Sequence, residues 1–185
     1  MKRTIVIITG FILTAAAYAQ PTEVGQRREN QQDRIAQGVG SGSLTAGETS
    51  NLEKKESAIN QEIRTDRSLN GGTLTGSERA TINGQQNQMS KQIYADKHNA
   101  AVQHYGNNEV DARRFNQQQR IANGISSGHL NAGETARLEK GEAAINRETR
   151  TDRALNGGHL TGGERAQINH QQNFMSGKIY QHKHN

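Results

Sequence analysis

The chain has 185 residues, of which 23 are Lys or Arg and 18 are Asp or Glu, so its net charge is +5. It has no cysteine, which excludes disulfides, thiolate metal sites and a cysteine nucleophile. Aromatic residues make up 4% and hydrophobic residues 31%. With so few rings for stacking on bases and so little excess charge, we expect no nucleic-acid partner.

Residues 1–19 have the pattern of an export signal. Lys2 and Arg3 form a positive start, an apolar stretch follows, and the final Ala-Tyr-Ala matches the small-x-small cleavage rule. Cleavage would leave Gln20 as the mature N-terminus and lower the net charge from +5 to +3, because Lys2 and Arg3 leave with the signal. No later stretch is long and apolar enough for a membrane span. The sequence therefore predicts a periplasmic or secreted protein.

The rest of the chain is an internal duplication. Residues 24–99 and 110–185 are identical at 51 of 76 aligned positions, with a constant spacing of 86. Identity of this extent reflects duplication and not biased composition. We predict a helical repeat over 20–99, a linker over 100–108 and a second helical repeat over 109–185.

A shorter unit occurs twice in each copy and reads as a helix start. It contains Gly, then Leu, then Thr or Asn, then Glu three residues later, which is the capping-box pattern. Apolar residues then recur at helical spacing, as in Leu52, Ile59 and Ile63, without the alternation of a strand. We therefore predict an all-α fold of two tandem three-helix repeats. The six predicted helices cover 24–39, 46–69, 76–97, 110–125, 132–155 and 162–183.

Each repeat has few large apolar residues, so we expect it to bury little apolar surface and to need other contacts for its stability. Glutamines on the first and third helices, such as Gln31 and Gln86, are candidates for polar ladders between helices or between molecules. Self-association or an envelope partner would supply further burial.

The helix–loop–helix units resemble the EF-hand, whose loop has Gly at position 6, an aliphatic residue at 8 and Glu at 12. The matching sets are Gly42, Leu44 and Glu48; Gly72, Leu74 and Glu78; Gly128, Leu130 and Glu134; and Gly158, Leu160 and Glu164. The duplicated pattern also resembles that of exported bacterial repeat proteins. The resemblance implies EF-hand-like helix pairs with adjacent loops, although positions 1 and 3 hold residues such as Arg67 and Leu69 that are no oxygen ligands of Ca²⁺.

A second register keeps calcium as a candidate ligand. Asp66-x-Ser68-x-Asn70-Gly71 begins like a calcium loop and ends near Glu78. The second copy has the corresponding residues Asp152, Asn156 and Glu164, with Ala154 in place of Ser68. The competing interpretation is that the aspartates are solvated charges and the glutamates are helix caps.

Histidines are the other candidate ligands. The second copy gains His129 and His159 in its loops and His182 near its end, where His184 follows. If the loops pair as in the EF-hand, His129 and His159 lie on adjacent loops. Imidazole favours Zn²⁺ or Cu²⁺, although exposed loop histidines are usually only solvated.

No nucleophile elbow, phosphate loop or metalloprotease motif occurs. Acid pairs at Glu53 and Glu56, and at Glu139 and Glu142, stand among lysines at a spacing that favours helix surfaces. We therefore predict no enzyme. The expected function is a non-enzymatic binding or structural role in the cell envelope or outside the cell, and the alternative is binding of Ca²⁺, Zn²⁺ or Cu²⁺.

Overall fold

A computed structural model describes residues 22–184, and within this range the chain forms six helices and no strand. Each predicted helix agrees with an observed one to within two residues at either end. The export signal predicted for residues 1–19 lies outside the described residues. The helices are α1 (Glu23–Ser41), α2 (Ala46–Leu69), α3 (Gly76–Lys97), α4 (Glu109–Ser126), α5 (Ala132–Leu155) and α6 (Gly162–Lys183).

All four predicted capping boxes are present. At the start of α2, the Thr45 amide donates to the Glu48 carboxylate over 2.9 Å, and the Glu48 amide donates to the Thr45 hydroxyl over 3.3 Å. Gly42, with φ 75°, ends α1 in the left-handed conformation that glycine adopts at low cost. The remaining boxes join Thr75 to Glu78, Asn131 to Glu134 and Thr161 to Glu164.

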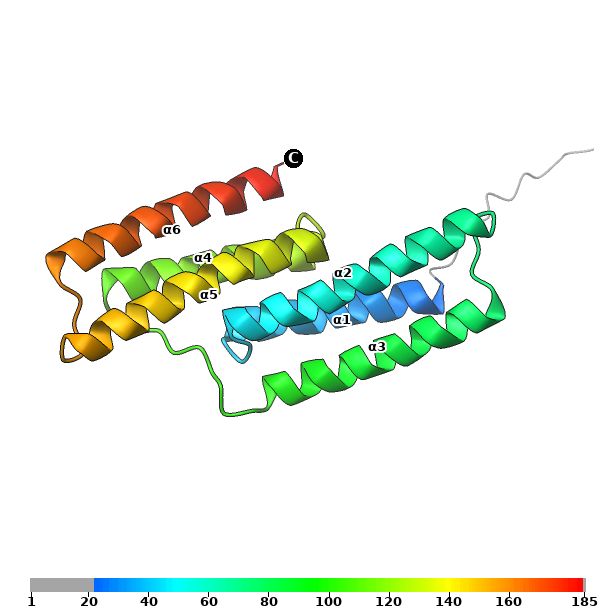
Figure 1. The fold of residues 1–185 in the computed structure, drawn as a ribbon, viewed down its shortest axis with the longest axis horizontal. Coiled ribbons are helices and arrows are strands. Elements are labelled where there is room, and N and C mark those ends of the chain that lie inside the picture. Colours follow the sequence, from blue (N-terminus) through cyan, green and yellow to red (C-terminus); the bar gives the residue numbers. More distant parts are fainter. Residues whose placement is uncertain (1–21, 185) are drawn as a thin grey trace, which may run out of the picture.

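The helices form an elongated array with α1–α3 at one end and α4–α6 at the other (Figure 1). Helix α3 packs against α1 and α2, and α6 packs against α4 and α5. The most extensive contacts join α2 to α5 and α1 to α4. Helices α2 and α5 run antiparallel, and the Ser50 hydroxyl on α2 donates to the carbonyl of Ala136 on α5 over 2.9 Å. Since positions 50 and 136 are equivalent in the duplication, the two halves meet at matching places.

The core is a narrow seam of aliphatic side chains, with Ile35, Ile82 and Ile121 among those with no exposed surface. Buried glutamines supplement it, as the sequence suggested. The Gln31 side chain donates to the Gln86 carbonyl over 2.6 Å, and the Gln86 side chain donates to the Val24 carbonyl over 3.0 Å. The second copy repeats both bonds through Gln117 and Gln172. These bonds satisfy buried polar groups and tie the third helix of each copy to the first.

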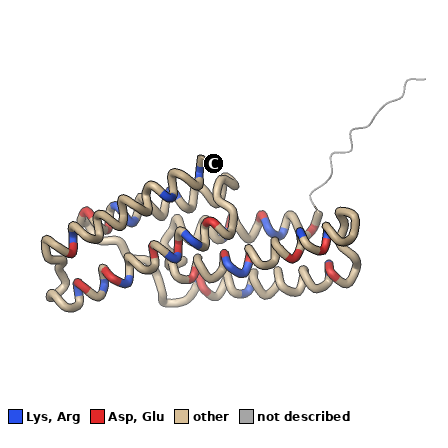
Figure 2. The backbone as a smooth tube through the Cα atoms, turned by 45° about the horizontal axis from the view of Figure 1, so that its top comes forward, with Lys and Arg blue, Asp and Glu red and all other residues tan. Residues whose placement is uncertain are grey.

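Basic and acidic residues are mixed along all the helices, and neither sign is confined to one end (Figure 2). Within residues 22–184, no helix is long and apolar enough to cross a membrane.

Glycines in α1 and α4 admit the leucines of the loops that follow. A Cβ atom at Gly124 would lie 2.6 Å from Cδ1 and 2.7 Å from Cγ of Leu130, which is 2% exposed. Gly38 has the same relation to Leu44. Each glycine therefore makes room for a leucine that anchors the next helix, and a larger residue would displace that leucine.

We expect Gly124→Ala to destabilise the protein by about 1–3 kcal/mol, because it overpacks the site of Leu130. Gly84→Ala is the matched control, since Gly84 is exposed within α3 and an added Cβ there would meet no atom within 4 Å. The control should stabilise the protein by up to about 1 kcal/mol through helix propensity. Urea unfolding followed by circular dichroism measures both, and a neutral Gly124→Ala variant would contradict this account of the loop.

Candidate functional site

The residues of the predicted calcium register lie together at the end of α2 and the start of α3. The Asn70 side-chain NH₂ donates to both Glu78 carboxylate oxygens, over 2.8 and 2.9 Å, and to the Asp66 carbonyl over 2.9 Å. All three partners are acceptors, so the amide faces Glu78 with its nitrogen and not with the oxygen that Ca²⁺ needs. Asn156, Asp152 and Glu164 repeat this arrangement in the second copy.

The carboxylates of this register also act as helix caps. A hydrogen bond from the Thr75 backbone lowers the pKa of Glu78, and one from Thr161 lowers the pKa of Glu164. Partial desolvation, together with the carboxylates of Glu78 and Glu62, raises the pKa of Asp66. The loop is therefore closed by its own hydrogen bonds.

The structure does not bring the predicted histidine ligands together, and the expectation that His129 and His159 lie on adjacent loops is wrong. His129 precedes α5 and His159 follows it, and a helix of 24 residues separates its ends by about 36 Å. The reason is that the two loops flanking each middle helix lie at opposite ends of that helix, not side by side (Figure 1).

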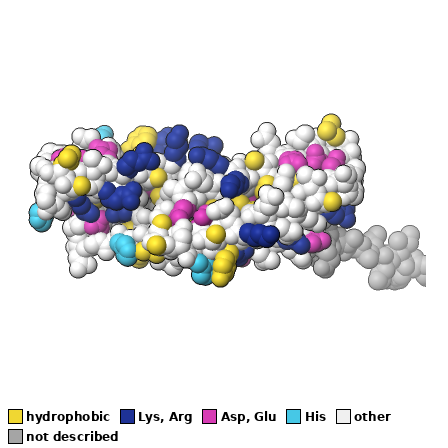
Figure 3. Space-filling view, turned by 60° about the horizontal axis from the view of Figure 1, so that its bottom comes forward, with side chains coloured by type: hydrophobic (Ala, Val, Ile, Leu, Met, Phe, Trp, Pro, Cys, Tyr) yellow, Lys and Arg dark blue, Asp and Glu magenta, His cyan; other side chains and the backbone are white. Residues whose placement is uncertain are grey.

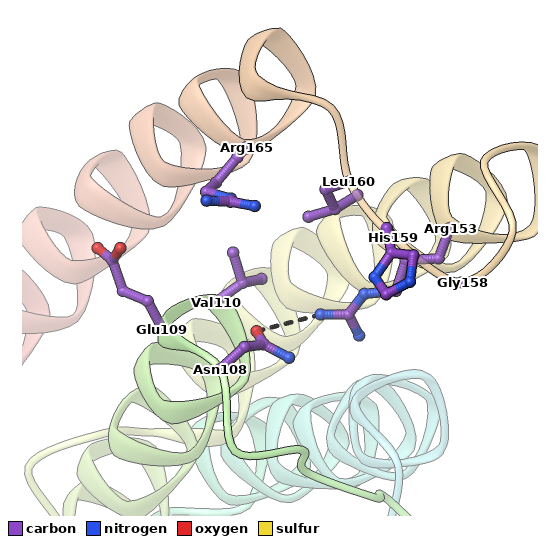
Figure 4. A pocket seen from close by; sticks show the side chains of 8 residues that line it. All are labelled: Asn108, Glu109, Val110, Arg153, Gly158, His159, Leu160 and Arg165. Atoms are coloured by element: carbon purple, nitrogen blue, oxygen red, sulfur yellow. Dashed lines mark hydrogen bonds between the residues drawn. The ribbon is translucent and has the colours of Figure 1, made fainter.

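The surroundings of the individual histidines are ill suited to a cation. His159 lies with Arg153 and Arg165 around a hollow of about 220 Å³ (Figure 4). His184 stacks on Tyr180 and its Nδ1 lies 2.7 Å from the Tyr180 carbonyl oxygen. His182 does meet a carboxylate, with Nδ1 3.5 Å from Glu134. Within residues 22–184, no three His, Asp or Glu side chains are grouped so as to hold a metal ion.

A cluster of acids lies instead where the two halves of the molecule meet. Glu53 and Glu56 on α2, and Glu139 and Glu142 on α5, each have no exposed surface. We call these four residues the seam glutamates. Their expected placement on helix surfaces is wrong, because the face of α2 that carries them is covered by α1 and α5, and that of α5 by α4 and α2.

In several seam glutamates, one carboxyl oxygen accepts a hydrogen bond from an amide side chain of the same copy. Gln32 donates to Glu53 over 3.2 Å, and Gln118 donates to Glu139 over 3.1 Å. Other oxygens, including Oε1 of Glu53 and both oxygens of Glu142, have no hydrogen-bond partner among the described residues. Ionised carboxylates in such surroundings would be strongly destabilised.

Burial raises the pKa of Glu53 to about 8 and the pKa values of Glu56 and Glu142 to about 7. Burial also raises the pKa of Glu139 well above its usual value, and the neighbouring carboxyls of Glu142 and Glu53 add to this shift. The charge of Arg28 opposes the shift at Glu56, and that of Arg114 opposes it at Glu142. The seam thus retains protons at a pH where exposed glutamates are ionised.

The segment between α3 and α4 places Tyr105 close enough to Glu139 and Glu142 for their charges to act on it. Its Tyr105 packs edge-on against Phe115, with ring centroids 5.4 Å apart, and lies under the guanidinium of Arg114 at 5.6 Å. Burial raises the pKa of Tyr105 to about 12.

Asp111 accepts from Arg114 over 2.9 Å and from Arg153 over 3.1 Å. Burial alone would raise the pKa of Asp111, but the hydrogen bonds outweigh it and lower that pKa.

The sequence did contain a signal for the buried acids. Glu56 stands four residues after Leu52, three before Ile59 and seven before Ile63, so it continues the apolar stripe of α2. The flanking lysines, Lys54 and Lys55, are both exposed. The charge of Glu56 led to its predicted placement on the helix surface, although its helical phase was that of the core residues.

No protein-family model, no curated protein and no solved structure matches the chain.

The seam glutamates should make the protein less stable as the pH rises. An unfolded glutamate loses its proton near pH 4.5, whereas Glu53 in the fold keeps it to about pH 8. Between these values the folded state binds more protons, so the free energy of unfolding falls with pH. Each protonated glutamate contributes a slope of about 1.4 kcal/mol per pH unit. The stabilisation is complete below pH 4.5 and is lost as the pH passes 7 to 8.

We expect Glu53→Gln/Glu139→Gln to flatten this dependence and to raise the melting temperature at pH 8. Melting followed by circular dichroism between pH 5 and pH 9 measures it. The matched control is Glu62→Gln/Glu148→Gln, which alters partly exposed glutamates further along the same helices and should keep the slope. A wild-type protein equally stable at pH 5 and pH 8.5 would refute buried, protonated acids at the seam.

Proposed function

We propose that this chain is an exported, non-enzymatic structural and binding protein, built of two tandem three-helix repeats over 20–99 and 109–185. The linker 100–108 joins them, and residues 1–19 direct export to the periplasm or the outside of the cell. The supporting observation is the seam itself. Paired acids with raised pKa values are typical of catalytic sites, but here they are enclosed between helices.

Catalytic acids must reach a substrate. Two hollows flank the seam, one lined by Arg28 and Gln32 and the other by Arg114, and none of the four seam glutamates lines either of them. The acids therefore serve the joint between the halves. A joint held by neutral carboxyls stabilises one elongated arrangement and is strongest in acidic surroundings, which suits a protein outside the cytoplasm.

Exposed apolar side chains support a binding role for the outer surface. Leu69 and Leu155, at the ends of α2 and α5, are 77% and 78% exposed. Tyr94 and Tyr180 are each 61% exposed and stack on His98 and His184. These positions recur in both copies, so a self-association or envelope partner could contact the two ends in the same way.

Binding of Ca²⁺, Zn²⁺ or Cu²⁺ is the second candidate function, and it has narrower support. The contact between His182 and Glu134 would supply two ligands, of which Zn²⁺ and Cu²⁺ accept both. The loop acids Asp66, Asp152, Glu78 and Glu164 are poorer candidates, because asparagine amides and helix amides already occupy the glutamate oxygens.

Calorimetric titration of the metal-free mature protein separates the two candidates. The structural proposal predicts no saturable heat with Ca²⁺, Zn²⁺ or Cu²⁺ and the same melting temperature with and without chelator. A stoichiometric heat that His182→Ala abolishes, and His129→Ala leaves intact, would overturn it in favour of a metal site at the end of α6. Stabilisation by a metal would then follow the concentration dependence of ligand linkage.

Export has its own test. Protein recovered from outside the cytoplasm should begin at Gln20, as measured by N-terminal sequencing. Replacing Ala17 and Ala19 with Leu should block processing, because the cleavage site requires small residues. Recovery of the unprocessed chain in the cytoplasm alone would contradict the proposed location.

A further inference from the structure

A cationic hollow of about 510 Å³ lies between the start of α2, the segment 101–104, and α4 with α5. Four arginines line it, and no Asp or Glu does; they are Arg114, Arg147, Arg150 and Arg153. The face shown in Figure 3 has Lys and Arg side chains gathered over the α4–α6 half of the molecule. The volume falls within the range of small-molecule sites, about 300–1,000 Å³.

Two of these arginines carry uncompensated charge. Arg114 and Arg153 share Asp111, whereas Arg147 and Arg150 form no ion pair with any residue in 22–184. The backbone amides of Ala46 and Gly47, in the first turn of α2, have no acceptor within their own helix. They border the same hollow and add the positive end of a helix dipole. The four arginines and the one carboxylate of Asp111 leave a surplus of three positive charges, which is enough to balance a doubly charged oxyanion.

Buried polar groups without partners also line this hollow. Arg114 is 7% exposed and its Nε has no hydrogen-bond partner among the described residues. Asn146 is 6% exposed, and its Oδ1 likewise lacks a partner. A guanidinium N–H offers a donor to an anion, and an amide oxygen offers an acceptor to a hydroxyl. Buried groups left in this state are destabilising until a ligand satisfies them.

The corresponding hollow on the other side of the seam, at the start of α5, differs in charge. It is lined by Arg28 and Arg64, but also by Glu29 and Asp33. Position 61, which corresponds to Arg147, is Gln in the first copy. A Cβ at Gly47 would meet no atom within 4 Å, whereas one at Gly133 would contact Ser57 at 3.4 Å. Of these two corresponding hollows, the one at the start of α2 therefore has more room beside the first-turn glycine and is the one lined by basic residues without acids.

We propose that this hollow binds a phosphate monoester carrying a free hydroxyl group. The phosphate lies between Arg147, Arg150 and the first turn of α2, and the hydroxyl donates to Asn146. Arginine binds phosphate through paired N–H groups, which makes it the favoured partner of such an anion. The same chemistry occurs in a free polyol phosphate and in a lipid headgroup, and the experiment distinguishes these sources.

Calorimetry with the full mature protein at constant ionic strength uses three probes: inorganic phosphate, glycerol 3-phosphate, and vesicles containing lysophosphatidic acid, a lipid phosphate monoester that keeps one free hydroxyl. We expect saturable 1:1 binding of glycerol 3-phosphate, at least about tenfold tighter than binding of inorganic phosphate. Arg147→Gln/Arg150→Gln should weaken binding of every bound probe at least tenfold, because both residues are exposed and the substitution leaves the fold intact. Asn146→Ala should remove the preference for glycerol 3-phosphate over inorganic phosphate.

The matched control is Lys54→Gln/Lys140→Gln, which removes two exposed charges outside the hollow and should bind as the wild type does. Binding to vesicles alone, lost in the arginine variant, identifies the headgroup as the source of the phosphate; binding of the soluble ester alone identifies a free metabolite. The proposal is overturned if no probe binds at concentrations up to about 10 mM. It is also overturned if the lysine control loses as much affinity as the arginine variant, or if the arginine variant loses none. Melting of each variant at pH 5 confirms its fold.

Discussion

The burial of four glutamates between α2 and α5 is the constraint on which the rest of the structure depends. The apolar seam is thin, and the extensive contacts between α2 and α5 and between α1 and α4 are made around Glu53, Glu56, Glu139 and Glu142. Burying carboxyls is unfavourable unless they remain neutral or are paired. The fold accommodates them mainly by raising their pKa values, with amides and arginines of the covering helices as secondary partners. The stability of the joint is thereby linked to proton concentration.

Buried polar contacts compensate elsewhere for the scarcity of large apolar residues. Gln31 and Gln86, and their counterparts Gln117 and Gln172, donate to backbone carbonyls of a neighbouring helix. Such bonds contribute little net free energy, but leaving them unmade would be strongly unfavourable. They therefore fix the register of helix pairs that a narrow aliphatic stripe would leave loosely determined. A chain poor in aliphatic residues can in this way still specify one arrangement.

The helices were predictable because their signals are local. A capping box such as Thr45 with Glu48 involves four consecutive residues, and its geometry is the same in any fold. The arrangement of the helices was less accessible, because the EF-hand resemblance implied adjacent loops and the two loops flanking α5 lie about 36 Å apart. The seam glutamates were misplaced for a related reason. The helical phase of Glu56 indicated the core side of α2, and only its charge argued for the surface. Glu53 lies off that apolar stripe, so its burial depends on the packing of α5 against α2, which the sequence of one helix does not reveal.

Duplication explains why one half of the molecule differs in chemistry from the other while the seam stays symmetric. The seam glutamates are identical in the two copies and are buried in both. The flanks of the seam have diverged. Asp111 stands where the first copy has Gly25, and Arg147 where it has Gln61. The segment that joins the copies lies over the second copy's flank through Tyr105 and borders the arginine hollow. The residues shared by the two copies therefore form the joint, and the positions at which the copies differ give one flank the side chains for binding.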